Sequence, residues 1–117
     1  GKSMDAVNEL LADAKAIEEA GAFMIMVEGV PVSVCKYIRD NINIPIIGIG
    51  AGPECEIQGL IFQDMLGFTD WVPKFAKKYA NIGPQMLDAF NTYHKEVTEG
   101  QFPTPEYSYN TKVEGLE

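Results

Sequence analysis

The hydrophobic residues at the start of the chain follow a helical period. Between Met4 and Ala20 they recur at steps of three and four residues, which is typical of a helix with one buried stripe. The stripe consists of Val7, Leu10, Leu11, Ala14 and Ile17. Ser3 is a suitable N-cap and Gly21 a suitable stop. We therefore expect a helix from Met4 to Ala20.

Two uninterrupted apolar runs follow, Phe23–Val27 and Ile44–Ile49. Neither shows the alternation of a half-exposed strand, and glycines follow both. Runs of this kind are typical of strands that are covered on both faces, as in a parallel sheet flanked by helices. Between them Pro31 begins a second helical pattern, in which Val34, Cys35 and Ile38 face inward.

The second half of the chain gives weaker patterns. A helical period covers Ile57–Leu66 but includes Gly59, which costs about 1 kcal/mol against alanine in a helix. Phe68–Pro73 is short and aromatic, and we interpret it as extended. A last helix is expected at about 84–99, followed by an extended tail over 101–117 with two prolines. The apolar positions of that helix are Met86, Leu87, Phe90, Tyr93 and Val97.

The order helix, strand, helix, strand, helix predicts an α/β fold with a parallel sheet in a single domain, residues 1–117. A complete (β/α)8 barrel requires eight strands and about 250 residues. This chain has two clear strands, so it cannot close a barrel by itself.

Composition narrows the classes of function. The chain is 46% hydrophobic and 22% charged, which is ordinary for a globular protein, and its net charge of -8 disfavours binding to nucleic acid or anionic membranes. No run approaches the roughly 18 apolar residues of a membrane helix, and no signal-peptide pattern is present. We therefore expect a cytoplasmic protein. Cys35 and Cys55 lack the spacing of a zinc or redox motif, and we expect plain thiols.

Candidate chemistry lies where the two apolar runs end. Glu28 directly follows the first run, and ligands of α/β enzymes bind at the carboxyl ends of parallel strands. A solvated loop carboxylate is the alternative interpretation of Glu28. The second run ends in Gly48-Ile49-Gly50-Ala51-Gly52, where the backbone can approach a ligand closely. A tight strand-to-loop turn explains this stretch equally well, and Pro53 argues against a dinucleotide fingerprint.

Other polar residues give no site by themselves. Glu54, Glu56 and Asp64 are interpreted as solvated positions of an acidic chain rather than as a metal cluster. His94 is the only histidine, and we expect it at the surface of the last helix. It leaves no histidine-containing ligand set or catalytic triad to assemble.

Several segments together resemble one enzyme family. They are 13–22 (DAKAIEEAGA), 27–31 (VEGVP), 44–52 (IPIIGIGAG), Gln58, 64–67 (DMLG), 73–79 (PKFAKKY) and 102–103 (FP). In this order and spacing the sequence resembles ketopantoate hydroxymethyltransferase (3-methyl-2-oxobutanoate hydroxymethyltransferase), an enzyme of pantothenate and coenzyme A biosynthesis. The resemblance covers only the C-terminal part of that family's (β/α)8 barrel.

The resemblance implies a reaction and a role for Glu28. The family transfers a hydroxymethyl unit from 5,10-methylenetetrahydrofolate to 3-methyl-2-oxobutanoate, giving 2-dehydropantoate, and its catalytic base corresponds to Glu28. At the mouth of a barrel we expect Glu28 to be partly desolvated. Gly48, Gly50 and Gly52 correspond to lining of the substrate pocket. The family's Mg²⁺ ligands lie in the part that precedes this chain, so no metal ligand is expected here.

The resemblance also implies a homo-oligomer that acts on a small molecule. Isolated, the chain is expected to be inactive, because the metal ligands are absent from it. The sequence departs from the family at Glu56-Ile57-Gln58, where aspartate, glycine and glutamine are usual, and at Gln63, where histidine is usual. Two alternatives to the hydroxymethyltransferase function stay open. The chain could be a truncated or divergent, non-catalytic assembly module with open sheet edges. It could also belong to another enolate-forming enzyme of the phosphoenolpyruvate and pyruvate group.

Overall fold

A computed structural model describes residues 1–116, so residue 117, the last of the expected tail, lies outside it. The first helix, α1 (Met4–Glu19), begins where the sequence predicts. The Ser3 Oγ accepts a hydrogen bond from the Ala6 N–H at 3.3 Å, and Gly21 follows with a φ of 94°. The described chain continues with β1 (Ile25–Glu28), α2 (Val32–Arg39), β2 (Ile46–Ile49), β3 (Ile57–Gln58), α3 (Phe62–Leu66), α4 (Gly83–Thr98) and the short 3₁₀ helix η1 (Pro105–Tyr107).

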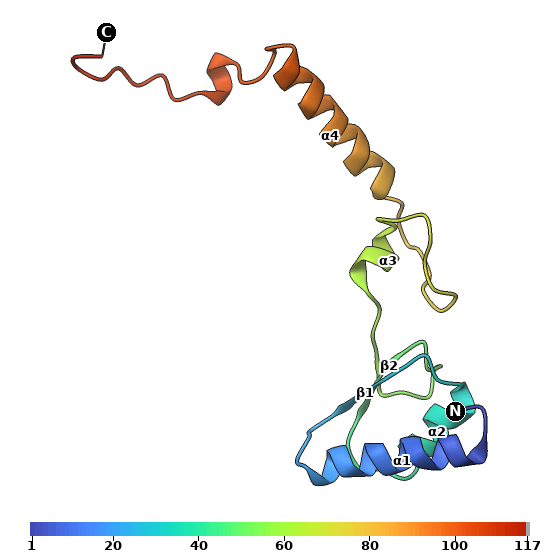
Figure 1. Cartoon of the computed structure of the whole chain (residues 1–117). Helices are drawn as coiled ribbons and strands as arrows, with labels where there is room; N and C mark the ends of the chain where they lie inside the picture. The colour runs from blue at the N-terminus through green and yellow to red at the C-terminus, as the bar shows by residue number, and fades with distance from the viewer. Residues whose placement is uncertain (117) are drawn as a thin grey trace.

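The three strands form one parallel sheet in the order β1-β2-β3. Ile25 pairs with Ile46 and Glu28 with Ile49, so β1 and β2 end together. Helices α1 and α2 pack against each other and cover one face of this sheet (Figure 1). The α2 stripe buries Val34, Cys35 and Ile38 against Ile25 and Ile46, as its helical period predicts. Helix α1 buries Val7 and Ala14, whereas Ile17 of its expected stripe is 48% exposed. The expected α/β architecture with a parallel sheet is confirmed.

The other face of the sheet is open at β1, which corrects the expectation that this strand is covered on both faces; in β2, on that face, Ile47 is half-buried and Ile49 is buried. In β1 the burial alternates, with Ile25 and Val27 buried and Met26 and Glu28 exposed; Met26 is 61% exposed. Continuous apolar sequence predicts two covered faces, but within residues 1–116 the helices supply cover for only one. The three strands therefore form an open sheet.

The helix expected over Ile57–Leu66 is wrong in its first half. Ile57 and Gln58 instead form β3, which pairs with Ile47 and Gly48 of β2, and the Gly59 N–H donates to the Gly48 carbonyl at 2.8 Å. Only Phe62–Leu66 is helical. Phe68–Pro73, which we interpret as extended, forms no strand: residues 68–70 are bends and residues 71–73 have no regular secondary structure.

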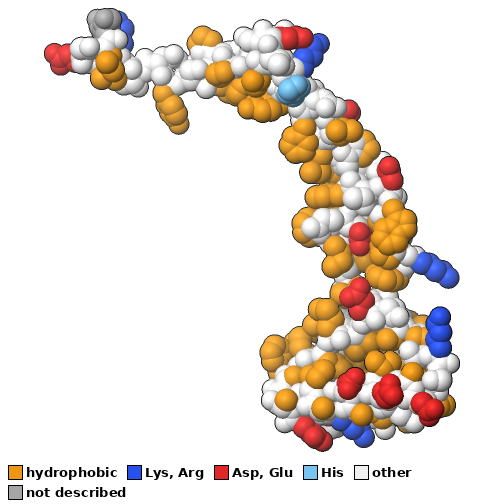
Figure 2. Space-filling view, in the orientation of Figure 1, with side chains coloured by type: hydrophobic (Ala, Val, Ile, Leu, Met, Phe, Trp, Pro, Cys, Tyr) orange, Lys and Arg blue, Asp and Glu red, His pale blue; other side chains and the backbone are white. Residues whose placement is uncertain are grey.

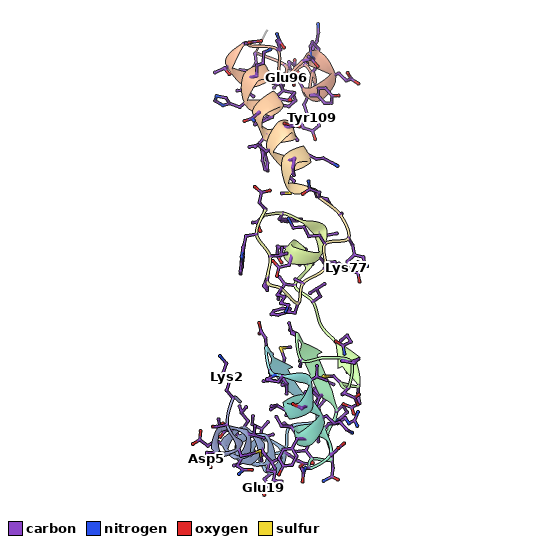
Figure 3. The ribbon with its side chains drawn as sticks, turned by 90° about the vertical axis from the view of Figure 1, so that its right-hand side faces the viewer. Lys2, Asp5, Glu19, Lys77, Glu96 and Tyr109 are labelled. Atoms are coloured by element: carbon purple, nitrogen blue, oxygen red, sulfur yellow. The ribbon has the colours of Figure 1, made fainter. Side chains whose placement is uncertain are left out.

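The sheet unit, residues 1–59, carries a long arm, residues 60–116. The arm contains α3, α4 and η1, and Figure 1 shows it leading away from the sheet. The last helix matches its predicted bounds within one residue at each end. The described molecule measures 77 × 34 × 20 Å, and its radius of gyration is 24.7 Å, against about 13 Å for a compact domain of this length. Figure 3 shows Glu96 and Tyr109 at the end of the molecule opposite Asp5 and Glu19.

Apolar side chains line the arm without being buried by it. Leu87, Phe90 and Tyr93 of α4 are 60%, 64% and 57% exposed, and no residue of this helix, which is described in full, is buried. Figure 2 shows hydrophobic side chains along the arm as well as over the sheet unit. None of the helices in the described part of the chain has the length and apolar character needed to cross a membrane.

Candidate functional site

Glu28 is the last residue of β1 and lies at the carboxyl-terminal edge of the sheet. The parallel register pairs it with Ile49, the last residue of β2, and the Gly29 N–H donates to the Ile49 carbonyl oxygen at 2.8 Å. The Glu28 strand tip is thereby held beside the turn that begins at Gly50. Tips of neighbouring parallel strands are where α/β folds place ligands.

The side chain of Glu28 lies on the open face of the sheet. Met26 precedes it on the same face, and Ile49 is its neighbour on β2. The partial desolvation expected of Glu28 is not found, because its side chain is exposed. The reason is the uncovered face, since α1 and α2 pack on the opposite side.

The glycines after β2 shape the loop beside Glu28. Gly50 has a φ of 62°, and a Cβ there would lie 2.5 Å from the Phe75 ring. Gly52 has a φ of 89°, and a Cβ there would lie 2.6 Å from Cγ2 of Val32. Both positions therefore need glycine for conformation and for space. Gly48 has no such φ and lies within β2.

A hollow of about 770 Å³ lies between this loop and the first part of the arm. Gly50, Gly52 and Gln58 line one side, and the Gln58 amide donates to the Gly52 carbonyl at 2.9 Å. Phe75, Lys77 and Tyr79 line the other side. Figure 3 labels Lys77 on the arm segment between α3 and α4. Gly48 is not among the lining residues.

Glu28 lines a separate, smaller hollow of about 180 Å³ against α1. Asp13 and Ile17 of α1 are among its other lining residues. The structure thus places Gly50 and Gly52 at the larger hollow and Glu28 next to them along the sheet edge, without joining all three in one cavity.

The remaining polar candidates either form local hydrogen bonds or lie away from Glu28 on the helices of the arm. Glu54 accepts a hydrogen bond from the Arg39 guanidinium at 3.0 Å, and the Glu56 carboxylate accepts one from the Ile46 N–H at 2.9 Å. Asp64 lies on α3 and His94 is exposed on α4. Across residues 1–116, no three His, Cys, Asp or Glu side chains are grouped so that they could hold a metal ion.

The two cysteines form a pair that the sequence reasoning missed. Both are free thiols, as expected, but their Sγ atoms lie 3.0 Å apart and share a hydrogen bond. Burial raises the pKa of Cys35 to about 12, and the hydrogen bond with Cys55 and the nearby charges of Cys55 and Glu56 act in the same direction. Two features could have indicated this contact: the inward position of Cys35 on its helix, and a loop after β2 that folds back towards α2. The spacing of twenty residues gave no indication.

The chemistry available at the edge is that of an accessible carboxylate. Glu28 can accept a proton from a carbon acid that is brought to the open face, provided that the reacting atom comes within hydrogen-bonding distance. The glycine loop beside it presents backbone groups rather than side chains. The described residues thus place an exposed carboxylate next to a glycine loop at the sheet edge.

A comparison with protein families finds one match that covers most of the chain. The sequence profile of ketopantoate hydroxymethyltransferase matches residues 1–105. This match includes all three strands and helices α1 to α4.

Curated relatives with the same name are about half identical to this chain. A 3-methyl-2-oxobutanoate hydroxymethyltransferase of Clostridium acetobutylicum is 54% identical over 110 residues, which is 93% of this chain and 40% of the relative. The enzyme of Clostridium botulinum is 51% identical over the whole chain and 43% of its own length. That of Heliobacterium modesticaldum is 51% identical over 99% of the chain and 43% of its own length. The chain therefore spans about two fifths of the length of these relatives.

Proposed function

Because this chain belongs to the ketopantoate hydroxymethyltransferase family, we propose that it supplies the C-terminal β/α units of a (β/α)8 barrel enzyme. The proposed reaction transfers a hydroxymethyl unit from 5,10-methylenetetrahydrofolate to 3-methyl-2-oxobutanoate, giving 2-dehydropantoate for pantothenate synthesis. The observation that carries the proposal is the position of Glu28 at a strand tip, beside a glycine loop and on a face of the sheet that is open. The proposed compartment is the cytoplasm.

In this proposal Glu28 removes a proton from the carbon next to the ketone of the keto acid. A base in this role must lie within hydrogen-bonding distance of the proton that it takes. The open face gives a substrate access to the Glu28 carboxylate, and the loop that begins at Gly50 lies beside it along the sheet edge. Gly48 is proposed to support the glycine loop from within β2, where it has no side chain. Loss of that proton to solvent then returns the Glu28 carboxylate to its starting state.

Magnesium does not fit the residues that the structure describes. No grouping of three ligating side chains exists within residues 1–116, and the carboxylates nearest the loop already bind Arg39 and the Ile46 N–H. We propose that the family's Mg²⁺ would be held by residues outside this sequence. Alone, the chain is then expected to form no 2-dehydropantoate from the keto acid, the folate donor and Mg²⁺.

A chimera tests the proposal directly. The matching 110 residues of the Clostridium acetobutylicum relative are replaced by those of this chain, and formation of 2-dehydropantoate is measured. We expect the chimera to be active and Glu28→Gln to lower kcat by roughly 10²- to 10⁴-fold, the usual contribution of a general base. Glu9→Gln, which changes an exposed carboxylate on α1, is the matched control. An active chimera that is indifferent to Glu28→Gln would contradict the role of Glu28.

A second candidate, an assembly module, is favoured by the exposed apolar residues of the arm. Leu87, Phe90 and Tyr93 form a stripe at helical spacing in which every side chain is more than half exposed, although the Tyr93 ring also contacts the Phe102 ring. Exposed apolar surface of this extent is typical of a protein interface. We propose that the family enzyme is a homo-oligomer and that this stripe is covered in the assembly. Light scattering during size-exclusion chromatography tests this, and a stably folded single copy of 12.9 kDa would contradict it.

A further inference from the structure

Cys35 and Cys55 are twenty residues apart in the chain but adjacent in space. Cys35 lies on α2 with an exposed fraction of 0%, and Cys55 lies in the loop between β2 and β3 with part of its side chain accessible. Their Sγ atoms are 3.0 Å apart. A disulfide bond is about 2.0 Å long, so a closure of about 1 Å separates the two states.

The surrounding residues hold the two thiols in this position. A Cβ at Gly48 would lie 2.3 Å from Cys55 Sγ, so the absence of a side chain there provides the space that Cys55 occupies. Arg39 of α2 donates to the carbonyl oxygen of Glu54 at 2.9 Å, which fixes the residue before Cys55 to the helix that carries Cys35. The loop is therefore anchored to α2 next to the thiol pair.

We propose that Cys35 and Cys55 are an oxidation site, which a low-molecular-weight disulfide converts into an intramolecular disulfide that fastens the loop between β2 and β3 to α2. In the first step the Cys55 thiolate attacks one sulfur of oxidised glutathione, and the glutathione S–S bond breaks and releases one glutathione thiolate. In the second step the Cys35 thiolate attacks the Cys55 sulfur of the mixed disulfide and displaces the second glutathione. Both thiol protons pass through solvent to the released glutathione thiolates, so two protein thiols are oxidised and one glutathione disulfide is reduced.

The order of the two steps follows from access. Cys35 is fully buried, so a disulfide from solution cannot reach it. Burial together with the hydrogen bond to Cys55 also raises the pKa of Cys35 to about 12, which disfavours its thiolate. Cys55 is partly exposed at the edge of the large hollow. Modification of Cys55 removes the contributions of its hydrogen bond and its charge to the raised pKa of Cys35. The second attack is then intramolecular.

The site goes beyond the proposed transferase reaction and has its own consequence. Cys55 lines the same hollow as Gly50, Gly52 and Gln58. A bond from Cys55 to α2 fixes that wall of the hollow in one position, and a thiol reductant releases it.

Peptide mapping tests the inference on the full chain. Lys36 and Arg39 lie between the two cysteines, so trypsin separates them into the peptides 16–36 and 40–74. After exposure to oxidised glutathione and digestion without reductant, we expect these peptides to appear linked and lighter by two hydrogen atoms. The link should form at least roughly tenfold faster in buffer than in urea, because folding supplies the proximity.

Single variants separate the two roles. In Cys35→Ser we expect glutathione to remain bound at Cys55, and in Cys55→Ser we expect Cys35 to stay reduced while circular dichroism shows a folded chain. A mixture of isotope-labelled and unlabelled chains distinguishes links within one copy from links between copies. The inference is overturned if the folded chain retains glutathione at Cys55 without forming the link, if the link forms equally fast in urea, or if it joins only different copies. None of these measurements depends on transferase turnover.

Discussion

Gly48 lies beneath Cys55, and the space left by its missing side chain is filled by sulfur. The separation of 2.3 Å between a Cβ built at Gly48 and the Cys55 Sγ is far below any real contact, and the Cys55 Cβ would lie at 3.0 Å. Because Gly48 is buried in the middle strand, its neighbours have little freedom to move. This residue pair gives a direct test of packing at the loop.

We expect Gly48→Ala to lower the free energy of unfolding by about 1–3 kcal/mol, the usual cost of overpacking a core. Urea unfolding measures the loss. Cys55→Ala removes the sulfur, so the double variant should recover part of the stability that Gly48→Ala loses. If the two substitutions were simply additive, this contact would not be the cause.

Asp40 gives a prediction about pH. Hydrogen bonds from Arg39, and then from Lys36, hold the pKa of the Asp40 carboxyl below its ordinary value of 3.8. A lowered folded-state pKa stabilises the fold above the unfolded value, and this contribution is lost as the pH falls through the folded pKa. We therefore expect the urea midpoint of the wild type to fall more steeply below pH 3.8 than that of Asp40→Asn. Parallel curves for the two proteins would count against the prediction.

At the candidate site, the sequence was sufficient to predict that Glu28 lies at a strand tip, but not which residues surround its side chain. An apolar run that ends in a carboxylate and a glycine locates a strand tip, and the structure has Glu28 as the last residue of β1. Its exposure depends on what covers the second face of the sheet, which no local pattern encodes. The contact between Cys35 and Cys55 likewise depends on tertiary structure, because the loop after β2 folds back towards α2. The spacing of the two cysteines in the sequence does not indicate it.

At the scale of elements, local periodicity was sufficient for the long helices and failed for β3. Helices α1 and α4 each repeat their apolar positions over several turns, and both lie within two residues of their predicted ends. Ile57–Leu66 has a similar but shorter pattern. There the edge of β2 offers backbone partners to Ile57, Gln58 and Gly59, and this pairing outweighs the weak helical preference.

For α4 we expect stability and association to respond differently to substitution. Leu87→Gln combined with Phe90→Gln should change the free energy of unfolding by less than about 0.5 kcal/mol, because both side chains are exposed within the chain. The same pair should lower the mass measured by light scattering to that of one copy. Asp88→Asn with Lys95→Gln changes the polar side of the helix and should leave the mass unchanged. A loss of stability equal to that of a core substitution would mean that the stripe packs within its own chain.

At the scale of the whole molecule, the sheet unit and the arm differ in how well their backbone is protected from local unfolding and proteolysis. The segment between α3 and α4, residues 67–82, forms no helix or strand in the described structure, although the Tyr79 and Ile82 N–H groups donate to carbonyls of Met65 and Leu66. Backbone of this kind opens more readily than helices packed on a sheet. Lys15 and Lys36, by contrast, lie within α1 and α2.

We therefore expect brief digestion with trypsin to cut first after Lys74 or Lys77, at least roughly tenfold faster than after Lys15 or Lys36. Mass spectrometry of the early products measures the order. Initial cleavage in α1 or α2 would show that the sheet unit is the less protected part.

The uncovered stripe of α4 also determines what natural selection can act on. No residue of this fully described helix is buried, so Leu87 and Phe90 contribute little to the free energy of folding of their own chain. In the proposed assembly, a substitution there is accepted or rejected by its effect on the surface that meets α4. The apolar spacing of α4 should therefore change during evolution together with that surface rather than with the core around Ile46.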